Sequence, residues 1–251
     1  MLAEQPYCSV QGEGMWTGMP MTFVRLQGCN VGCVWCDSYY TWMPHNVERI
    51  PDEIKNNSSP IIVSFEELYS VLDKISCSHV WFTGGEPSLQ SEAIVNFMKI
   101  TTPWDFQYHI CTAGRIYNSK LFDLLHFITV DVKAPSSNTS SKKDVVDKIY
   151  KEHSIKTEFK MVVDNTESDK EFAKRMVDKY NRVEWTLQPK YISEVTLLSG
   201  KHKQLSMFVD KMYWELEQFA QWVVDNFKQY PNVRMGTQFH KHVWRDRQRG
   251  I

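Results

Sequence analysis

Three cysteines lie close together near the start of the chain, in the run Gly28-Cys29-Asn30-Val31-Gly32-Cys33-Val34-Trp35-Cys36-Asp37-Ser38. Their C-x3-C-x2-C spacing allows three thiolates to bind one metal centre, and thiolates are soft ligands that suit iron–sulfur clusters and zinc. A 4Fe-4S cluster bound by three cysteines leaves one iron free to bind another molecule. A zinc ion would need a further ligand, such as His45 or a distant residue. The spacing favours the open cluster, with structural zinc as the alternative.

The overall composition excludes several other classes of protein. A chain of 251 residues with 42% hydrophobic and 13% aromatic content can fill a large α/β core. A formal net charge of -1 gives no sign of a surface for direct nucleic-acid binding. The sequence contains no signal-peptide-like apolar run and no stretch of about 18 apolar residues, so we expect a cytoplasmic location and no membrane association. The remaining cysteines, Cys8, Cys77 and Cys111, are scattered, and we expect each to be a small buried hydrophobic residue.

Strands and helices alternate along most of the chain. Alternation predicts a strand over 21–27 that leads into the cysteine loop, and Ser64 with Glu67 forms a capping box at the start of an amphipathic helix. A polar stretch around 44–60 indicates a surface insertion. Further strands are expected over 79–83, 107–112, 127–133, 156–163, 184–188 and 233–238, and further helices over 92–100, 118–126, 143–153, 168–181 and 208–227.

This alternation predicts βαβ units with right-handed crossovers and a mainly parallel sheet of about six to seven strands. The pattern by itself does not choose between an open sheet and a complete or partial barrel. In each of these architectures the functional site gathers at the C-terminal ends of the strands. The cysteine loop and the runs Gly84-Gly85-Glu86-Pro87, Asp131-Val132-Lys133 and Gln188-Pro189 all follow or end an expected strand, so we expect them to meet at one edge.

The cysteine loop followed by Asp37 resembles the cluster loop of the radical S-adenosylmethionine (SAM) superfamily. Together with Gln11-Gly12-Glu13-Gly14, the run from Phe23 to Cys29, and the motifs after the later strands, it is similar to the 7-carboxy-7-deazaguanine synthase family. This resemblance covers nearly all of the chain. It implies a single domain over 1–251 that forms an incomplete TIM-like β/α barrel of the radical SAM type, with a pocket-closing tail around 239–251.

The resemblance also implies the cofactors and the residues that hold them. Cys29, Cys33 and Cys36 would bind the 4Fe-4S cluster, and Ser38 stands where most of the family has a threonine that binds Mg2+. In this chain Asp131 and Val132 replace the serine and proline that usually precede the lysine. SAM would be bound by Trp35, Asp37, Gly85, Glu86, Asp131, Val132, Lys133, Gln188 and Pro189.

The pterin-like substrate has its own set of implied contacts. An arginine in an otherwise apolar strand needs an anionic partner, and Arg25 would grip the substrate carboxylate with two parallel hydrogen bonds. The alternative partner is an internal carboxylate such as Glu13 or Glu86. The other implied substrate-binding residues are Val10, Gln11, Gly12, Glu13, Thr83 and His240. Arg245, Arg247 and Arg249 with Lys241 make the C-terminal tail basic.

The activity that the resemblance implies is a ring contraction. The enzyme would convert 6-carboxy-5,6,7,8-tetrahydropterin into 7-carboxy-7-deazaguanine with release of ammonia, with SAM regenerated, in 7-deazapurine (queuosine-type) biosynthesis. It would take electrons from a flavodoxin or ferredoxin and form a homodimer. Two alternatives remain from the sequence: a radical SAM activase of a glycyl-radical enzyme, and a non-enzymatic iron–sulfur or zinc protein.

Overall fold

Eight strands form one sheet in the computed structural model, which describes residues 1–42, 60–101, 106–190 and 216–244. The strands follow one another across the sheet in chain order, with β1 antiparallel to β2 and every later pair parallel. The strands are β1 (Tyr7–Val10), β2 (Pro20–Leu26), β3 (His79–Gly84), β4 (Gln107–Thr112), β5 (Phe127–Asp131), β6 (Thr157–Val163), β7 (Glu184–Pro189) and β8 (Val233–Met235).

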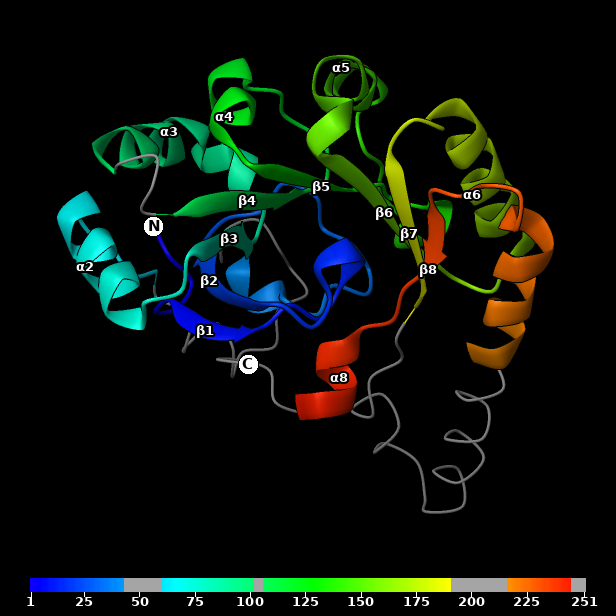
Figure 1. The fold of residues 1–251 in the computed structure, drawn as a ribbon, viewed down its shortest axis with the longest axis horizontal. Helices are drawn as coiled ribbons and strands as arrows, with labels where there is room; N and C mark the ends of the chain where they lie inside the picture. Colours follow the sequence, from blue (N-terminus) through cyan, green and yellow to red (C-terminus); the bar gives the residue numbers. More distant parts are fainter. Residues whose placement is uncertain (43–59, 102–105, 191–215, 245–251) are drawn as a thin grey trace.

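Helices cover one face of this sheet in an arc (Figure 1). They are α2 (Phe65–Ile75), α3 (Ser91–Ile100), α4 (Ser119–Leu124), α5 (Lys143–His153), α6 (Glu167–Lys179) and a helix over 216–227, while α8 (Phe239–Trp244) lies at the other face. Short 3-10 turns are η1 (Gly14–Trp16), η2 (Tyr39–Thr41), η4 (Pro87–Gln90), η5 (Pro135–Ser137) and η6 (Ser154–Lys156). No helix in the described part of the chain combines the length and apolar character that crossing a bilayer requires.

The sheet confirms the expected partial β/α barrel, because it curves without β1 pairing to β8. The seven strands β2 to β8 are parallel, and β1 adds an antiparallel eighth strand where six to seven strands were expected. The sequence analysis assigned no strand before residue 21. β1 has only four residues, too few for a clear alternation.

The capping box is present, with Ser64 accepting from the Glu67 amide and Glu67 accepting from the Ser64 amide. Other expected elements end two or three residues early. The strand expected over 127–133 ends at Asp131, and the helix expected over 168–181 ends at Lys179. The helix expected to 126 ends at Leu124, because the His126 amide donates to the Tyr108 carbonyl and joins the strand edge. The strand expected to 238 ends at Met235, and the chain then turns so that the Phe239 amide donates to the Gly12 carbonyl. The expected insertion, except residue 60, and the helix segment 208–215 lie outside the described residues.

Strand alternation creates two separate cores. The outward side chains, such as Val24, Phe82, Ile110, Phe159 and Trp185, pack under the helices in the large core. The inward side chains form a smaller core of Met21, Phe23 and Trp81, with Tyr7, Trp16, Met19 and Cys111 packed against it. Above this inner core the inward positions become polar, and a pocket opens there.

Candidate active site

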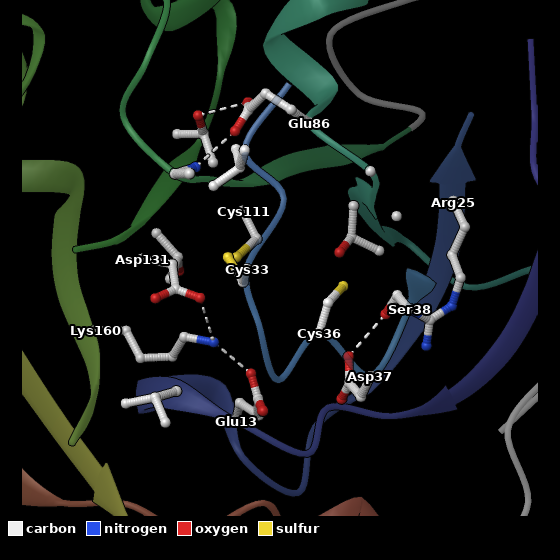
Figure 2. A pocket seen from close by; sticks show the side chains of 18 of the residues that line it. Glu13, Arg25, Cys33, Cys36, Asp37, Ser38, Glu86, Cys111, Asp131 and Lys160 are labelled. Carbon is white, nitrogen blue, oxygen red and sulfur yellow. Dashed lines mark hydrogen bonds and ion pairs between the residues drawn. The ribbon is translucent and has the colours of Figure 1, made fainter. Parts of the chain in front are cut away.

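A single pocket collects most of the residues that the sequence analysis selected. Of the implied set it is lined by Val10, Gln11, Gly12, Glu13, Arg25, Cys29, Cys33, Trp35, Cys36, Asp37, Ser38, Thr83, Gly85, Glu86, Asp131, Lys133 and His240. They come from the ends of several strands and from the loops that follow them, as expected for a parallel sheet. Figure 2 shows the side chains of 18 of the lining residues, ten of them labelled, with the cysteine loop crossing the centre of the view.

The cysteine loop is closed at its base by a backbone hydrogen bond and is anchored in its middle to the segment after β5. The Gly28 amide donates to the Thr41 carbonyl at 2.7 Å, which closes the base of the loop. The Val34 amide donates to the Ser137 carbonyl at 3.2 Å, and the Thr139 hydroxyl donates to the Val31 carbonyl at 3.2 Å. The loop is therefore held against the segment that follows β5.

The three thiols of this loop fit the donor set of an iron–sulfur cluster. Cys33 is buried, Cys29 and Cys36 are half-buried, and none of them forms a disulfide. Burial raises the pKa of all three thiols, that of Cys36 to about 12, so the thiolate form depends on a bound cation. In a cubane each cysteine binds its own iron, whereas a zinc ion needs its ligands around one point. The described residues contain no group of three or more His, Cys, Asp or Glu side chains that could hold a single metal ion.

Gly84 and Gly85 allow the chain to pack against itself. A Cβ atom on Gly85 would lie 1.9 Å from the Gly28 carbonyl oxygen, and one on Gly84 would lie 2.5 Å from the Leu26 nitrogen. The Gly85 amide donates to the Leu26 carbonyl and the Glu86 amide to the Gly28 carbonyl. The family resemblance implies a SAM contact at Gly85, one of these two glycines. The structure shows a close approach between the ends of β2 and β3.

Glu86 is 2% exposed, and its carboxylate is satisfied from within the protein. It accepts hydrogen bonds from the amide and hydroxyl of Ser88, from the Thr112 hydroxyl at 2.7 Å and from the Ala113 amide at 2.7 Å. These contacts join the ends of β3 and β4. Glu86 therefore helps to fix the pocket wall as well as lining it.

Arg25 has an anionic partner, but neither of the internal carboxylates expected for it. Its Nε atom lies 2.9 Å from Glu4 Oε1 and 2.8 Å from the Tyr7 hydroxyl, and its Nη1 donates to Ser38 Oγ at 3.5 Å. The alternative of an internal carboxylate as partner is therefore confirmed, but the partner is Glu4. Glu13 and Glu86 are engaged elsewhere. Glu4 precedes β1, whose position beside β2 was not apparent from the sequence.

A chain of alternating charges crosses the opposite wall. Lys133 Nζ lies 2.9 Å from Asp131 Oδ2, Lys160 Nζ lies 3.4 Å from the same oxygen, and Lys160 also forms an ion pair with Glu13. Burial opposes the charged form of Glu13, but Lys160 and then His240 outweigh it and lower the pKa of Glu13 well below its usual range. Burial likewise opposes the charge on Lys160, and Asp131 and Glu13 raise the pKa of this lysine. Both groups are therefore ionised.

Asp37 and Ser38 contact each other and approach the C-terminal segment. Ser38 Oγ donates to Asp37 Oδ1 at 2.8 Å, and His240 Nε2 lies 3.9 Å from Asp37 Oδ2. A Cβ on Gly12 would lie 2.2 Å from His240 Nδ1, so the glycine permits α8 to approach. His240 belongs to the pocket wall. Arg245, Arg247 and Arg249 lie outside the described residues.

Three implied SAM contacts do not line the pocket. Val132 is 1% exposed and packs in the core under the helices, because it alternates with the inward-facing Asp131 and Lys133. Gln188 is buried and donates to Glu13 Oε1 at 3.2 Å. Its contact is therefore with a residue that lines the pocket and not with the pocket itself. Pro189 ends β7 beside them.

Some lining residues were missed by the sequence analysis. Lys160 lies on β6, Gln238 precedes α8, and Phe23 and Trp81 form the pocket floor with Cys111. The signal for Lys160 was a charged residue alternating with apolar ones in an otherwise buried strand, together with Glu158 two residues before it. The expectation for the scattered cysteines was wrong: Cys8 is exposed, and Cys77 and Cys111 are half-buried. Cys8 is on the sheet edge, and Cys111 points inward from β4.

An open, mainly parallel β/α barrel with three clustered cysteines after its first parallel strand defines a radical SAM protein. Residues 23–176 match the Radical SAM superfamily, which is more than half of the chain. The chain also belongs to the 7-carboxy-7-deazaguanine synthase family. It is 30% identical over 203 residues to the 7-carboxy-7-deazaguanine synthase of Thermoplasma acidophilum, covering 80% of this chain and 88% of that relative.

A second relative matches this chain along nearly its whole length, and two solved structures have a similar fold. The 7-carboxy-7-deazaguanine synthase of Koribacter versatilis is 29% identical over 251 residues, covering 98% of this chain and 97% of the relative. The crystal structure of QueE from Escherichia coli has the same fold, with a TM-score of 0.56 and 22% identity over 95% of this chain and 93% of that one. The structure of Streptococcus suis SuiB bound to S-adenosylmethionine gives a TM-score of 0.54 at 13% identity, covering 86% of this chain and 49% of SuiB.

Proposed function

We propose that this protein converts 6-carboxy-5,6,7,8-tetrahydropterin into 7-carboxy-7-deazaguanine and ammonia as a radical SAM lyase. The observation that carries the proposal is the convergence of the three cysteines, Glu13 and Arg25 on one pocket in a chain that matches full-length relatives of that name. When bound, the 4Fe-4S cluster and SAM supply the 5′-deoxyadenosyl radical that takes a hydrogen atom from C6 of the substrate. The side chains of the pocket bind the substrate and the cofactors and orient them.

The two sides of the pocket support different binding roles. Cys29, Cys33 and Cys36 would hold the cluster, while Lys133 and Asp131 lie on the same side as Cys33 and would face SAM. On the other side the Nη atoms of Arg25 would grip the substrate carboxylate, since its Nε is already engaged by Glu4 and Tyr7.

The polar wall at Glu13 would face the pterin ring. Gln11 is 5% exposed, and its Nε2 has no hydrogen-bond partner among the described residues, which leaves a buried donor for a ring acceptor. Thr83 lies beside Arg25 in the sheet register and completes this side of the pocket. His240 and Gln238 would close the pocket from the C-terminal segment. Closure excludes water and oxygen from the radical chemistry.

Several finer points belong to the same proposal. Ser38 Oγ lines the pocket beside Asp37, and we propose it as a protein ligand of Mg2+, an ion that prefers oxygen ligands. The cluster needs a one-electron donor such as a flavodoxin or ferredoxin, which places the enzyme in the reducing cytoplasm. A homodimer stays a prediction from the family, as does a single domain with an insertion near 44–60.

The test is anaerobic incubation of the reduced, cluster-loaded protein with SAM and 6-carboxy-5,6,7,8-tetrahydropterin. We expect 7-carboxy-7-deazaguanine in amounts exceeding the SAM consumed, because SAM is regenerated. A protein whose cluster responds to SAM by electron paramagnetic resonance but which leaves the tetrahydropterin unchanged would contradict the proposal and favour the activase alternative. A cluster spectrum unaffected by SAM would favour the non-enzymatic one.

A further inference from the structure

Lys160 is a buried cation in the charged wall of the pocket. It lies at an inward position of β6, 4% exposed, and lines the pocket. A charged group in such a place is stabilised only by partners that satisfy it. Figure 2 shows Lys160 extending into the pocket between Asp131 and Glu13. Its ammonium contacts both carboxylates.

The hydrogen-bonding capacity of Lys160 is not exhausted by these contacts. An ammonium has three N–H donors. One is used by Glu13 and a second faces Asp131. Within the described residues no further acceptor contacts the nitrogen, so one donor remains at the pocket surface.

The Glu13 carboxylate has an acceptor position beside this donor of Lys160. Its Oε1 accepts from Gln188 at 3.2 Å and from Gln238 at 2.8 Å, while its Oε2 accepts from Lys160. Each carboxylate oxygen can accept about two hydrogen bonds. Oε2 therefore keeps one acceptor position, next to the remaining donor of Lys160.

We propose that Lys160 and Glu13 together recognise the lactam edge of the pterin ring, with Lys160 donating to the C4 carbonyl oxygen and Glu13 accepting from N3–H. This assignment rests on the proposed function and adds a specificity-determining residue to it. A cyclic amide presents a donor and an acceptor side by side, which matches the adjacent acceptor and donor of this pair. A ring with an amino group at C4 presents a donor to Lys160 instead.

The ionisation of the pair fits a binding role better than proton transfer. The raised pKa of Lys160 makes the ammonium a weak acid, so it would not supply the proton for the departing ammonia. A charge that stays in place orients Glu13 and strengthens the hydrogen bond to the ring carbonyl. Lys160 is therefore a binding residue for the substrate.

The experiment compares two oxidised probes that differ at the lactam edge. 6-Carboxypterin has a C4 carbonyl and N3–H, whereas 2,4-diaminopteridine-6-carboxylic acid has a C4 amino group and an N3 without hydrogen. Binding to the cluster-loaded protein is measured anaerobically by probe fluorescence, which does not require turnover. For the parent protein we expect the 4-oxo probe to bind about 10- to 100-fold more tightly, the range for a hydrogen bond to a charged group. In Lys160→Met the preference should fall by about 10-fold, and what remains is the part that Glu13 supplies at N3–H.

Two further variants keep the result interpretable. Lys160→Met leaves Glu13 without its cation, whereas Asp131 keeps Lys133 as its partner. Lys160→Met with Glu13→Gln removes the uncompensated charge if the single variant does not fold. Lys151→Met, on the exposed face of α5, is the matched control and should keep the parent preference. SAM binding is measured in parallel, by the change that SAM produces in the cluster's electron paramagnetic resonance spectrum.

An undiminished preference for the 4-oxo probe in the folded Lys160 variants would overturn the lactam assignment. Equal binding of both probes to the parent would also overturn it, while leaving the proposed reaction intact. A loss of SAM binding with an unchanged 4-oxo preference would assign Lys160 to the cofactor instead. If the parent binds neither probe, the pterin substrate itself is wrong and the inference falls with the proposed function.

Discussion

The Nε atom of Arg25 lies 2.9 Å from Oε1 of Glu4, and this ion pair links the strand before the cysteine loop to the N-terminal segment. The side chains are 17% and 12% exposed, so the pair is largely shielded from water. The Glu4 carboxylate also accepts from the Tyr40 hydroxyl at 3.1 Å. Arg25 therefore has a structural role that is separate from its proposed contact with the substrate carboxylate.

Arg25→Ala should lower both stability and product formation. It leaves Glu4 partly buried without its cation, and we expect a loss of about 2–4 kcal/mol in the free energy of unfolding. Adding Glu4→Gln removes that uncompensated charge, so the double variant should regain much of the stability without regaining product. Denaturant unfolding, product formation and 5′-deoxyadenosine formation are measured together. Recovery of product along with stability would assign Arg25 to the scaffold alone.

Replacing Cys29, Cys33 or Cys36 with alanine should abolish the 4Fe-4S cluster, because each thiol binds a different iron. Iron and sulfide content after anaerobic reconstitution is the measurement. The Cys8→Ala, Cys77→Ala double variant should keep the parent content. Cys111→Ala is tested separately because its thiol lines the pocket. Loss of iron in that variant would make Cys111 a fourth ligand, contrary to the proposal.

Two glycine substitutions should affect different properties of the protein: Gly85→Ala its stability, and Gly12→Ala its binding of 6-carboxypterin. Gly85→Ala places a Cβ 1.9 Å from the Gly28 carbonyl, where backbone meets backbone, and should destabilise the fold by about 3 kcal/mol or more. Gly12→Ala meets the side chain of His240 at 2.2 Å, which can move with α8.

We expect Gly12→Ala to stay within about 1 kcal/mol of the parent in unfolding but to bind 6-carboxypterin roughly tenfold more weakly. Unchanged probe binding in Gly12→Ala would mean that α8 does not form part of the binding surface. Parent-like stability in Gly85→Ala would mean that the ends of β2 and β3 are free to separate.

His109 should make the protein less stable as the pH falls. It is 1% exposed in the inner core, and its ring contacts His79 at 3.0 Å. Burial, followed by repulsion from His79 and His126, lowers the pKa of His109 to about 3. In the unfolded chain the pKa of this histidine is about 6.5, so below pH 6.5 the unfolded chain binds a proton that the folded chain excludes. The stability present above pH 6.5 is therefore lost as the pH falls from about 6.5 to 3.

The expected contribution of His109 is about 2 kcal/mol of stability lost between pH 7 and pH 5. His109→Gln does not titrate and keeps a polar atom near His79, so its unfolding free energy should change less over this range. Denaturant titrations at the two pH values provide the comparison. The same pH dependence in parent and variant would refute the assignment to His109.

Magnesium should raise product formation, and Ser38→Ala should reduce this response. The hydroxyl lies beside the Asp37 carboxylate and is the protein oxygen proposed for the ion. Ser38→Thr keeps the hydroxyl and restricts its rotamer, so we expect a magnesium response at least as strong as that of the parent. Equal activation of all three proteins would exclude Ser38 as a ligand.

The sequence by itself determined the local chemistry and the order of the elements. The spacing of Cys29, Cys33 and Cys36 places three thiols in one loop, whatever the rest of the chain does. The alternation of strands and helices, and the capping box at Ser64, follow from short-range periodicity and were recovered with small errors at their ends. The placing of the motifs after strands was enough to predict a shared edge of the sheet.

Only the tertiary structure decided which side chain meets which. Glu4 reaches Arg25 because β1 pairs with β2, and Lys160 joins Glu13 to Asp131 across 147 and 29 positions of chain, respectively. Such distant contacts leave no periodic signal in a single sequence. Alternation separates Val132 from Asp131 and Lys133, and only the packing of the sheet decided which of the two faces holds the pocket. The register of neighbouring strands sets these relationships, and local propensity does not encode it.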